Sequence, residues 1–264
     1  MTKMTNELKI PFVKAHGAGN DFLLTWQDEV PAGSDLPGIA RAICARNEGI
    51  GADGWLLVER NAIRLFNADG SEPEISGNGT RCAAAFLLED QPAPEITIKT
   101  GAGAKHLRVI SRQGRHWMFE MDMGLPRYAP EDLRRKIPWG EVTILDVGNP
   151  QCVVFVDEFP PDWERRGAEL EVHPLFPKRT NVSFVKVVDR HTLAVRFFER
   201  GVGPTKSSGT GSTGAAAAAI LRGVAESPVT VATLAGDLVL RWDDSIYLTG
   251  PAVIIGCGAF YLGE

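Results

Sequence analysis

The sequence has no long hydrophobic run and no excess of basic residues. No stretch approaches the roughly 18 consecutive apolar residues of a membrane span, and the opening MTKMTNELKIPF lacks the pattern of a signal peptide. The formal net charge of −5 provides no basic surface for nucleic acid and no basic helix for a membrane. We therefore expect a cytoplasmic protein that binds neither nucleic acid nor membranes.

Cysteine and histidine are few and scattered. The four cysteines form no CxxC pair and stand beside apolar residues, which is typical of buried free thiols in a reducing cytosol. The five histidines show no metal-ligand spacing, so we expect no metal site. The cysteines are Cys44, Cys82, Cys152 and Cys257, and the histidines are His16, His106, His116, His173 and His191.

Short alternating segments predict that strands outnumber helices. The 264 residues, 44% of them apolar, suffice for one large domain or two smaller ones. Three hairpins are expected: one whose second arm is 116–123, after a turn at Gln113-Gly114, one joining 182–188 to 192–198, and one joining 238–242 to 246–248.

Three helices are expected. The first covers 36–44, with Ser34 or Asp35 as its N-cap and Gly49 just past its end. The other two, at 82–88 and at 215–221 ending at Gly223, are apolar nearly all round. A helix without a polar face is a buried helix.

These two apolar helices belong to an internal repeat. Each follows a serine–glycine turn, SGNG from Ser76 and SGTG from Ser208, and the two serines lie 132 residues apart. Gly148-Asn149 follows Gly19-Asn20 at nearly the same interval. The repeat predicts an α+β fold of two pseudo-symmetric domains from an internal duplication, each a mixed or antiparallel β-sheet curled as a barrel around a central buried helix. We place the lobes at residues 1–125 with 252–264 and at 126–251, with a cleft between them.

The paired serine turns predict an anion site in that cleft. A helix start exposes backbone N–H groups at the positive end of the helix dipole, and glycine lets a ligand approach the backbone. Ser76 or Ser208 alone could be a simple N-cap, worth about 1 kcal/mol. Two matched copies favour a shared site for a carboxylate.

Polar residues at strand ends could line the same cleft. Asparagine both donates and accepts hydrogen bonds, so it suits a zwitterionic amino acid, although any single one could be a turn residue. Glu199 could hold an ammonium group or could form a surface pair with Arg200. The candidates are Asn20, Asn67, Asn149, Asn181, Glu199 and Arg200.

Two glycine-rich segments lack the features of cofactor-binding motifs. The segment GVGPTKS at 201–207 lacks the second glycine of a P-loop, and GAGN at 17–20 precedes a strand rather than a helix. No lysine has a recognisable pyridoxal-phosphate context. We therefore expect no cofactor.

Several blocks of the sequence resemble the signature segments of the diaminopimelate epimerase family, in the same order and from Lys14 to the C-terminus. They are HGAGNDF at 16–22, GIGADG at 49–54, FNADGSE at 66–72, GNGTRC at 77–82, GNP at 148–150, ERG at 199–201, GTG at 209–211 and GPA at 250–252. The resemblance implies a cofactor-independent isomerase, an amino-acid epimerase or racemase in which two facing cysteines move a proton at the α-carbon. It also implies conversion of LL- to meso-diaminopimelate for lysine and cell-wall biosynthesis, and a homodimer.

The resemblance further assigns roles to individual residues. The N–H groups of Gly77-Asn78 and Gly209-Thr210 would bind the substrate α-carboxylate and stabilise the developing carbanion. The catalytic positions are Ser76 and Ser208, with Gln151 and Glu199 beside them. The two ends of the substrate would be recognised by Asn20, Asn67, Asn149, Asn181, Glu199 and Arg200.

The sequence departs from the family at three of these positions. Both catalytic cysteines are replaced by serine, at Ser76 and Ser208, and the usual histidine after GNP is Gln151. A thiol titrates near pH 8.5 and a serine hydroxyl several units higher, and each unit costs about 1.4 kcal/mol of driving force for proton transfer. Glu199 could activate one serine, but not obviously both.

Two origins of the serines stay open. The chain is either an engineered, inactivated variant or a natural relative with altered chemistry. Gln151 favours the natural relative, because an engineer who removes two thiols has little reason to change the histidine as well. Three functions follow. The chain is an epimerase of the diaminopimelate type, a lyase or isomerase in the manner of the wider superfamily, or an amino-acid-binding pseudoenzyme.

Overall fold

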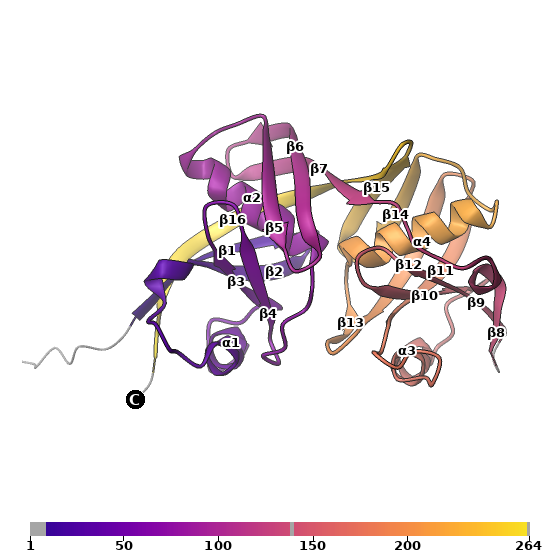
Figure 1. Cartoon of the computed structure of the whole chain (residues 1–264), viewed down its shortest axis with the longest axis horizontal. Helices are drawn as coiled ribbons and strands as arrows, with labels where there is room; N and C mark the ends of the chain where they lie inside the picture. The colour runs from indigo at the N-terminus through magenta and orange to yellow at the C-terminus, as the bar shows by residue number, and fades with distance from the viewer. Residues whose placement is uncertain (1–8, 138–139, 263–264) are drawn as a thin grey trace, which may run out of the picture.

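The computed structural model describes residues 9–137 and 140–262, which form a mixed α+β fold dominated by strands. Figure 1 shows two lobes side by side, one formed mainly by the N-terminal half of the chain and one by the C-terminal half. The strands of the first half are β1 (Lys9–Gly17), β2 (Asn20–Trp26), β3 (Gly54–Val58), β4 (Ile63–Asn67), β5 (Glu95–Thr100), β6 (Gly103–Gln113) and β7 (His116–Gly124).

The second half has shorter strands and ends in a long one. These strands are β8 (Arg135–Ile137), β9 (Gly140–Asp146), β10 (Pro150–Phe155), β11 (Asn181–Asp189), β12 (Thr192–Glu199), β13 (Gly203–Thr205), β14 (Val229–Thr233), β15 (Gly236–Trp242) and β16 (Ile246–Tyr261). The helices are α1 (Leu36–Cys44), α2 (Gly77–Asp90), α3 (Trp163–Glu171) and α4 (Gly209–Leu221), with 3-10 turns η1 (Gln27–Glu29) and η2 (Pro130–Arg134).

All three predicted hairpins are present. Strand β6 pairs with β7, β11 with β12, and β15 with β16. Strand β16, however, continues far beyond the expected end at residue 248. Proline cannot donate to a strand ladder, and Pro251 is accommodated because it lies between the β15 pairing, which ends at Thr249, and the β1 pairing, which begins at Val253.

Helices α2 and α4 are buried, as their composition predicts. From Gly77 to Ala85 every residue of α2 is buried, as is every residue of α4 from Gly209 to Ala219. Both helices start earlier than expected, because the glycine-rich turns after the serines are their first helical turns. The α1 prediction was right about the Asp35 N-cap, but this helix ends at Cys44, five residues before Gly49.

Strand β16 connects the lobes. Residues 246–249 pair with β15 and residues 246–253 with β7, while residues 253–261 pair with β1, so one strand runs from one lobe into the other (Figure 1). The lobe boundaries at 125/126 and 251/252 stay a proposal, as do the internal duplication and the closure of each half into a barrel. Within the described ranges, no helix is both long and apolar enough to cross a membrane.

Candidate active site

Ser76 and Ser208 cap the two buried helices in the same way. Each has an extended backbone, and each side-chain oxygen accepts a hydrogen bond at 3.1 Å from a backbone N–H three residues later, that of Gly79 or Gly211. The backbone N–H groups that precede these have no acceptor within their helix. Each turn therefore combines a serine hydroxyl with free N–H groups at the positive end of a helix.

The two helix starts lie directly against each other. A Cβ placed on Gly77 would lie 3.2 Å from the Cα of Gly209, and one placed on Gly209 would lie 3.0 Å from the Cα of Gly77. Any side chain at either position would push the helices apart. Glycine is required here because two backbones meet, and their meeting brings both sets of N–H groups to one place.

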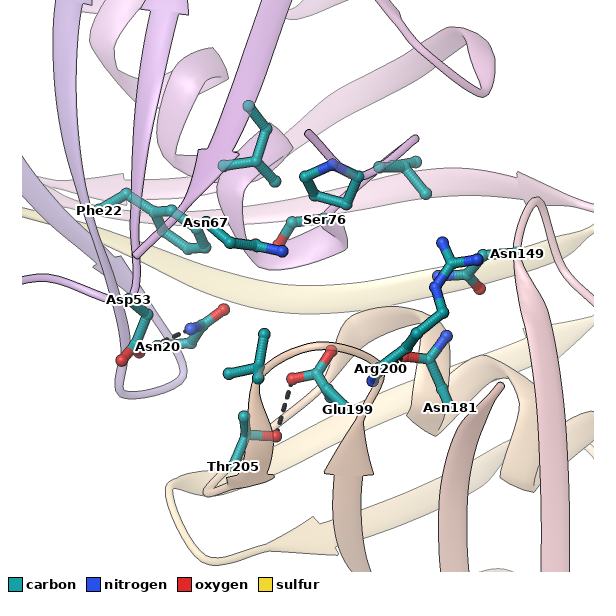
Figure 2. Close-up of a pocket in the computed structure, with 14 residues that line it drawn as sticks. Asn20, Phe22, Asp53, Asn67, Ser76, Asn149, Asn181, Glu199, Arg200 and Thr205 are labelled. Atoms are coloured by element: carbon teal, nitrogen blue, oxygen red, sulfur yellow. Dashed lines mark hydrogen bonds between the residues drawn. The ribbon is translucent and has the colours of Figure 1, made fainter. Parts of the chain in front are cut away.

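One narrow cavity, with a volume of about 50 Å³, collects most of the predicted residues (Figure 2). It is lined from both lobes. The predicted site residues that do not line it are Gly77, Asn78, Gln151, Ser208, Gly209 and Thr210. Phe22, Asp53, Leu65, Pro73, Ile75, Val202 and Thr205 also line it, together with the predicted Asn20, Asn67, Ser76, Asn149, Asn181, Glu199 and Arg200.

Glu199 is the carboxylate that touches a serine. It accepts hydrogen bonds from the Ser208 hydroxyl at 2.9 Å and from the Thr205 hydroxyl at 2.7 Å. Burial raises the pKa of Glu199 above its ordinary value, while the two hydroxyl donors act in the opposite direction. A carboxyl with a raised pKa beside a hydroxyl is suited to accept and return a proton.

The two serines differ in what accepts their protons. Ser208 is buried, and its hydroxyl donates to Glu199. Ser76 lines the cavity directly, and in the described part of the chain no carboxylate accepts its hydroxyl proton. One face of the site therefore has a base and the other has a free hydroxyl.

Asn20 and Asn78 are held in a directed chain of hydrogen bonds. Arg81 donates to Asn78 at 2.7 Å, Asn78 donates to Asn20 at 3.2 Å, and Asn20 donates to Asp53 at 2.7 Å. Because each amide uses its oxygen toward one neighbour and its nitrogen toward the other, both orientations are fixed. The fully buried Arg81 starts this chain just behind the N-terminus of α2.

Arg81 is a buried cation whose described hydrogen-bond partners are all neutral oxygens. Besides Asn78, it donates to the carbonyls of Pro251 and Gly77. Burial lowers the pKa of Arg81 to about 10, so it stays charged at neutral pH. Its charge adds to the helix dipole and favours an anion at the tip of α2.

Asn149 and Asn181 are fixed on the opposite wall. Asn149 donates to the Thr210 hydroxyl at 3.3 Å, and Asn181 donates to the Pro150 carbonyl while accepting the backbone N–H of Arg200, each at 3.0 Å. Arg200 does not pair with Glu199; within the described residues its partner is Glu74, at 2.5 Å. The surface pair that we considered for Glu199 is therefore not formed.

Gln151 lies behind the cavity rather than in it. Its side chain is fully buried and donates to Asn149 at 2.7 Å, while its Oε1 has no hydrogen-bond partner in the described part of the protein. Its methylenes pack against the bare backbone of Gly214 in α4. This geometry gives Gln151 contact with a residue of the site but not with the cavity.

None of the cysteines lines the cavity. Cys44, Cys82 and Cys152 are buried free thiols, as expected, and burial raises the pKa of each to about 12. Cys257 is exposed, which corrects the expectation for this residue: it lies near the end of β16, past the buried part of that strand. The described residues contain no cluster of three or more histidine, cysteine or acidic side chains that could hold a metal ion.

Residues that sequence reasoning missed are Asp53, Arg81, Thr205 and Glu74. Asp53 and Arg81 lie within the resembling blocks, so the blocks themselves contained a signal. For Glu74 the decisive partner is 126 residues away, which no local pattern reveals.

The sheet-rich fold is shared by solved structures of a hydroxyproline epimerase, a probable proline racemase and a methylitaconate-delta-isomerase. A hydroxyproline epimerase from Agrobacterium vitis superposes with a TM-score of 0.76 at 17% identity, covering 99% of this chain and 95% of that one. A Bacillus anthracis phenazine biosynthesis protein of the PhzF family superposes with a TM-score of 0.67 at 15% identity, covering 96% and 99%. These similarities show the fold.

Sequence comparison identifies the family. The model of the diaminopimelate epimerase family matches residues 12–129 and 143–255. The diaminopimelate epimerase of Moorella thermoacetica is 42% identical over 95% of this chain and 99% of that protein, and the one from Pelotomaculum thermopropionicum is 36% identical over 94% and 98%. The chain belongs to the diaminopimelate epimerase family, a family of isomerases.

Proposed function

We propose that the chain is a cofactor-independent isomerase that acts at the α-carbon of diaminopimelate or a similar amino acid. The observation that carries the proposal is the hydrogen bond from the buried Ser208 to Glu199, which lines the cavity together with Ser76. On this proposal the chain converts the LL to the meso isomer, the step that supplies lysine and cell-wall precursors.

The site supplies a partner for each group of such a substrate, some from residues that line the cavity and some from the two abutting helix starts, which do not line it. The α-carboxylate binds the N–H groups of Gly77-Asn78 and Gly209-Thr210, where two helix dipoles and Arg81 favour an anion. The α-ammonium lies against Glu199 and Asn20. The far end of the substrate binds the amides on the other walls and the guanidinium: Asn67, Asn149, Asn181 and Arg200.

The proton moves through hydroxyl groups. The Ser208 oxygen takes the α-proton as its own proton passes to Glu199, and the C–H electron pair stays on the α-carbon, delocalised into the carboxylate. Ser76 then donates its proton to the opposite face of the α-carbon and takes a new proton from solvent, while Glu199 releases the proton that it gained to solvent. Because a hydroxyl is a weaker acid than a thiol by several pKa units, and each unit is worth about tenfold in rate, turnover is slow.

Gln151 acts as a positioning residue in this scheme. Its hydrogen bond to Asn149 fixes the amide that faces the cavity. No proton is transferred through it.

The difference between the two serines supports a second candidate, a lyase or isomerase with one-sided chemistry. Among the described residues only Ser208, and not Ser76, donates to a carboxylate, so a proton removed there would return to the same face or leave with a β-substituent. A dehydrated or double-bond-shifted product from a hydroxy amino acid would identify this activity.

Exchange of the α-proton with D₂O tests the proposal. LL-diaminopimelate is incubated with the wild-type chain, with the Ser76→Cys/Ser208→Cys double variant and with Glu199→Gln, and deuterium uptake is followed by NMR. We expect slow exchange in the chain with both serines. The exchange rate should rise at least a hundredfold (about 2.7 kcal/mol) in the double variant. Glu199→Gln should show no exchange. Absence of exchange even with both thiols restored would contradict an isomerase.

We further propose, from the family resemblance, that the chain works as a cytoplasmic homodimer. Light scattering on the purified protein measures the assembly directly.

A further inference from the structure

The strongest further feature is an ion pair that closes the mouth of the cleft between the lobes. Arg200 comes from the turn after β12 in the C-terminal half, and Glu74 from the segment between β4 and α2 in the N-terminal half. Their side chains meet at 2.5 Å, with Arg200 20% exposed and Glu74 48% exposed. The pair therefore bridges the two lobes at the surface.

The same two segments touch at a second point. A Cβ on Gly201 would lie 3.7 Å from the Asp69 carboxylate, so the turn after β12 lies over the loop that leads to Ser76. Pro73, Ile75 and Ser76 from one segment, and Arg200 and Val202 from the other, line the narrow cavity. Separating these segments opens the cavity.

Ligand entry requires that separation. The cavity holds about 50 Å³, room for a few water molecules, whereas pockets that bury small-molecule ligands measure about 300–1,000 Å³. A wider cavity adjoins it and shares Asn20, Asp53, Val202 and Thr205, but Asn67, Asn149, Asn181 and Arg200 line only the narrow one. A ligand that reaches those residues has to part the loops.

Arg200 is also already occupied. Its two terminal nitrogens donate to Glu74 and to the Lys178 carbonyl, the latter at 3.4 Å. A guanidinium has five N–H donors, so a ligand carboxylate can bind through two of the remaining three, but it then shares the cation with Glu74. Two carboxylates on one guanidinium repel each other, so the incoming anion and Glu74 compete.

We propose that Glu74 is a latch: it closes the cleft by holding Arg200 and releases Arg200 to a ligand that carries a carboxylate at its far end. This inference rests on the proposed function, because it names the ligand group that opens the same site. Glu74 thereby weakens the binding of amino acids that carry a far-end carboxylate, which has to compete with it for Arg200, and leaves the binding of those with a bare amine there unaffected.

Calorimetric titration of two probes tests the latch. Meso-diaminopimelate has a far-end carboxylate, and L-lysine has the amine without it. Removing the competing carboxylate in Glu74→Gln should tighten diaminopimelate binding roughly two- to fivefold, the range typical of a partly exposed ion pair, and leave lysine unchanged. Unchanged or weaker diaminopimelate binding would overturn the latch.

The matched control lies two residues away. Glu72 is an exposed glutamate in the same loop, but it pairs with Arg64 within its own lobe. Glu72→Gln should change neither affinity. If it tightens diaminopimelate binding as much as Glu74→Gln does, a general change of charge explains the result and the latch is wrong.

Hydrogen exchange separates failure of the latch from failure of the proposed function. In ligand-free protein, Glu74→Gln should speed amide exchange in both 67–76 and 199–206, while Glu72→Gln should leave 199–206 unchanged. If the wild type binds neither probe, the amino-acid function fails but this measurement still decides the latch. If both segments of Glu74→Gln exchange at the same rates as in the wild type, the latch is refuted.

Discussion

Two opposing effects act on the ionisation of a single residue, Glu199. As a buried carboxyl it resists ionisation, and as the acceptor for Ser208 and Thr205 it is stabilised when ionised. Burial dominates, so its pKa is raised. The proposed reaction needs Glu199 as an ionised base. Above its raised pKa this buried, ionised carboxylate lowers the free energy of unfolding.

This conflict predicts a pH dependence. Glu199 titrates near 4.5 when unfolded and higher when folded, so the folded state binds more protons in between. The free energy of unfolding should therefore fall as pH rises from about 4.5 through the raised pKa, and then level off. Urea unfolding measured at a series of pH values from about 4.5 upward should show this fall in the wild type and not in Glu199→Gln.

A control with the opposite sign is available. Arg64 lowers the pKa of Glu72, so the stability that this residue adds is present above its ordinary pKa and is lost as pH falls through the lowered value. The difference in unfolding free energy between the wild type and Glu72→Gln should therefore shrink at acid pH. If the free energy of unfolding depends on pH in the same way in the wild type and in Glu199→Gln, burial does not raise the pKa of Glu199.

At the scale of elements, α2 and α4 have the same N-cap but different surroundings. Replacing Ser76 or Ser208 by alanine should cost about 1 kcal/mol of stability for the lost cap. Ser208→Ala should cost more at neutral pH, because it also removes one of the two hydroxyl donors to Glu199. Equilibrium denaturation of both variants measures the difference.

A double-mutant cycle isolates the source of that difference. In a Glu199→Gln background the extra cost of Ser208→Ala should disappear, leaving two equal caps. An extra cost that persists would show that it comes from packing around α4 rather than from the carboxylate.

The same two helices show what the sequence could predict. Their alanine runs indicated burial correctly, and the matched serines indicated that the asparagines, Glu199 and Arg200 would face one cavity. The helix starts were placed five residues late at α2 and six at α4, because glycines, though weak helix formers, form the first turns where two backbones touch. The partners of Arg81, Asp53 and Glu74 depend on contacts between distant segments, which periodicity does not encode.

At the scale of the whole molecule, β16 and the abutting helix starts join the lobes. Because β16 pairs with strands of both halves, neither half can lose its sheet without disturbing the other. We expect one cooperative transition on denaturation. Far-UV circular dichroism and tryptophan fluorescence should give the same midpoint, since Trp26 and Trp55 report on one half and Trp163 and Trp242 on the other. Two separated midpoints would contradict this coupling.

The pairing of β1 with β16 also governs the order in which the protein can be completed during translation. Residues 9–16 are made before their partners at 253–261, from which most of the sequence separates them. Until then the nascent chain exposes one edge of β1 as an open template for other strands. That edge of β1 is therefore open to pairing with other chains for as long as residues 253–261 have not folded onto it.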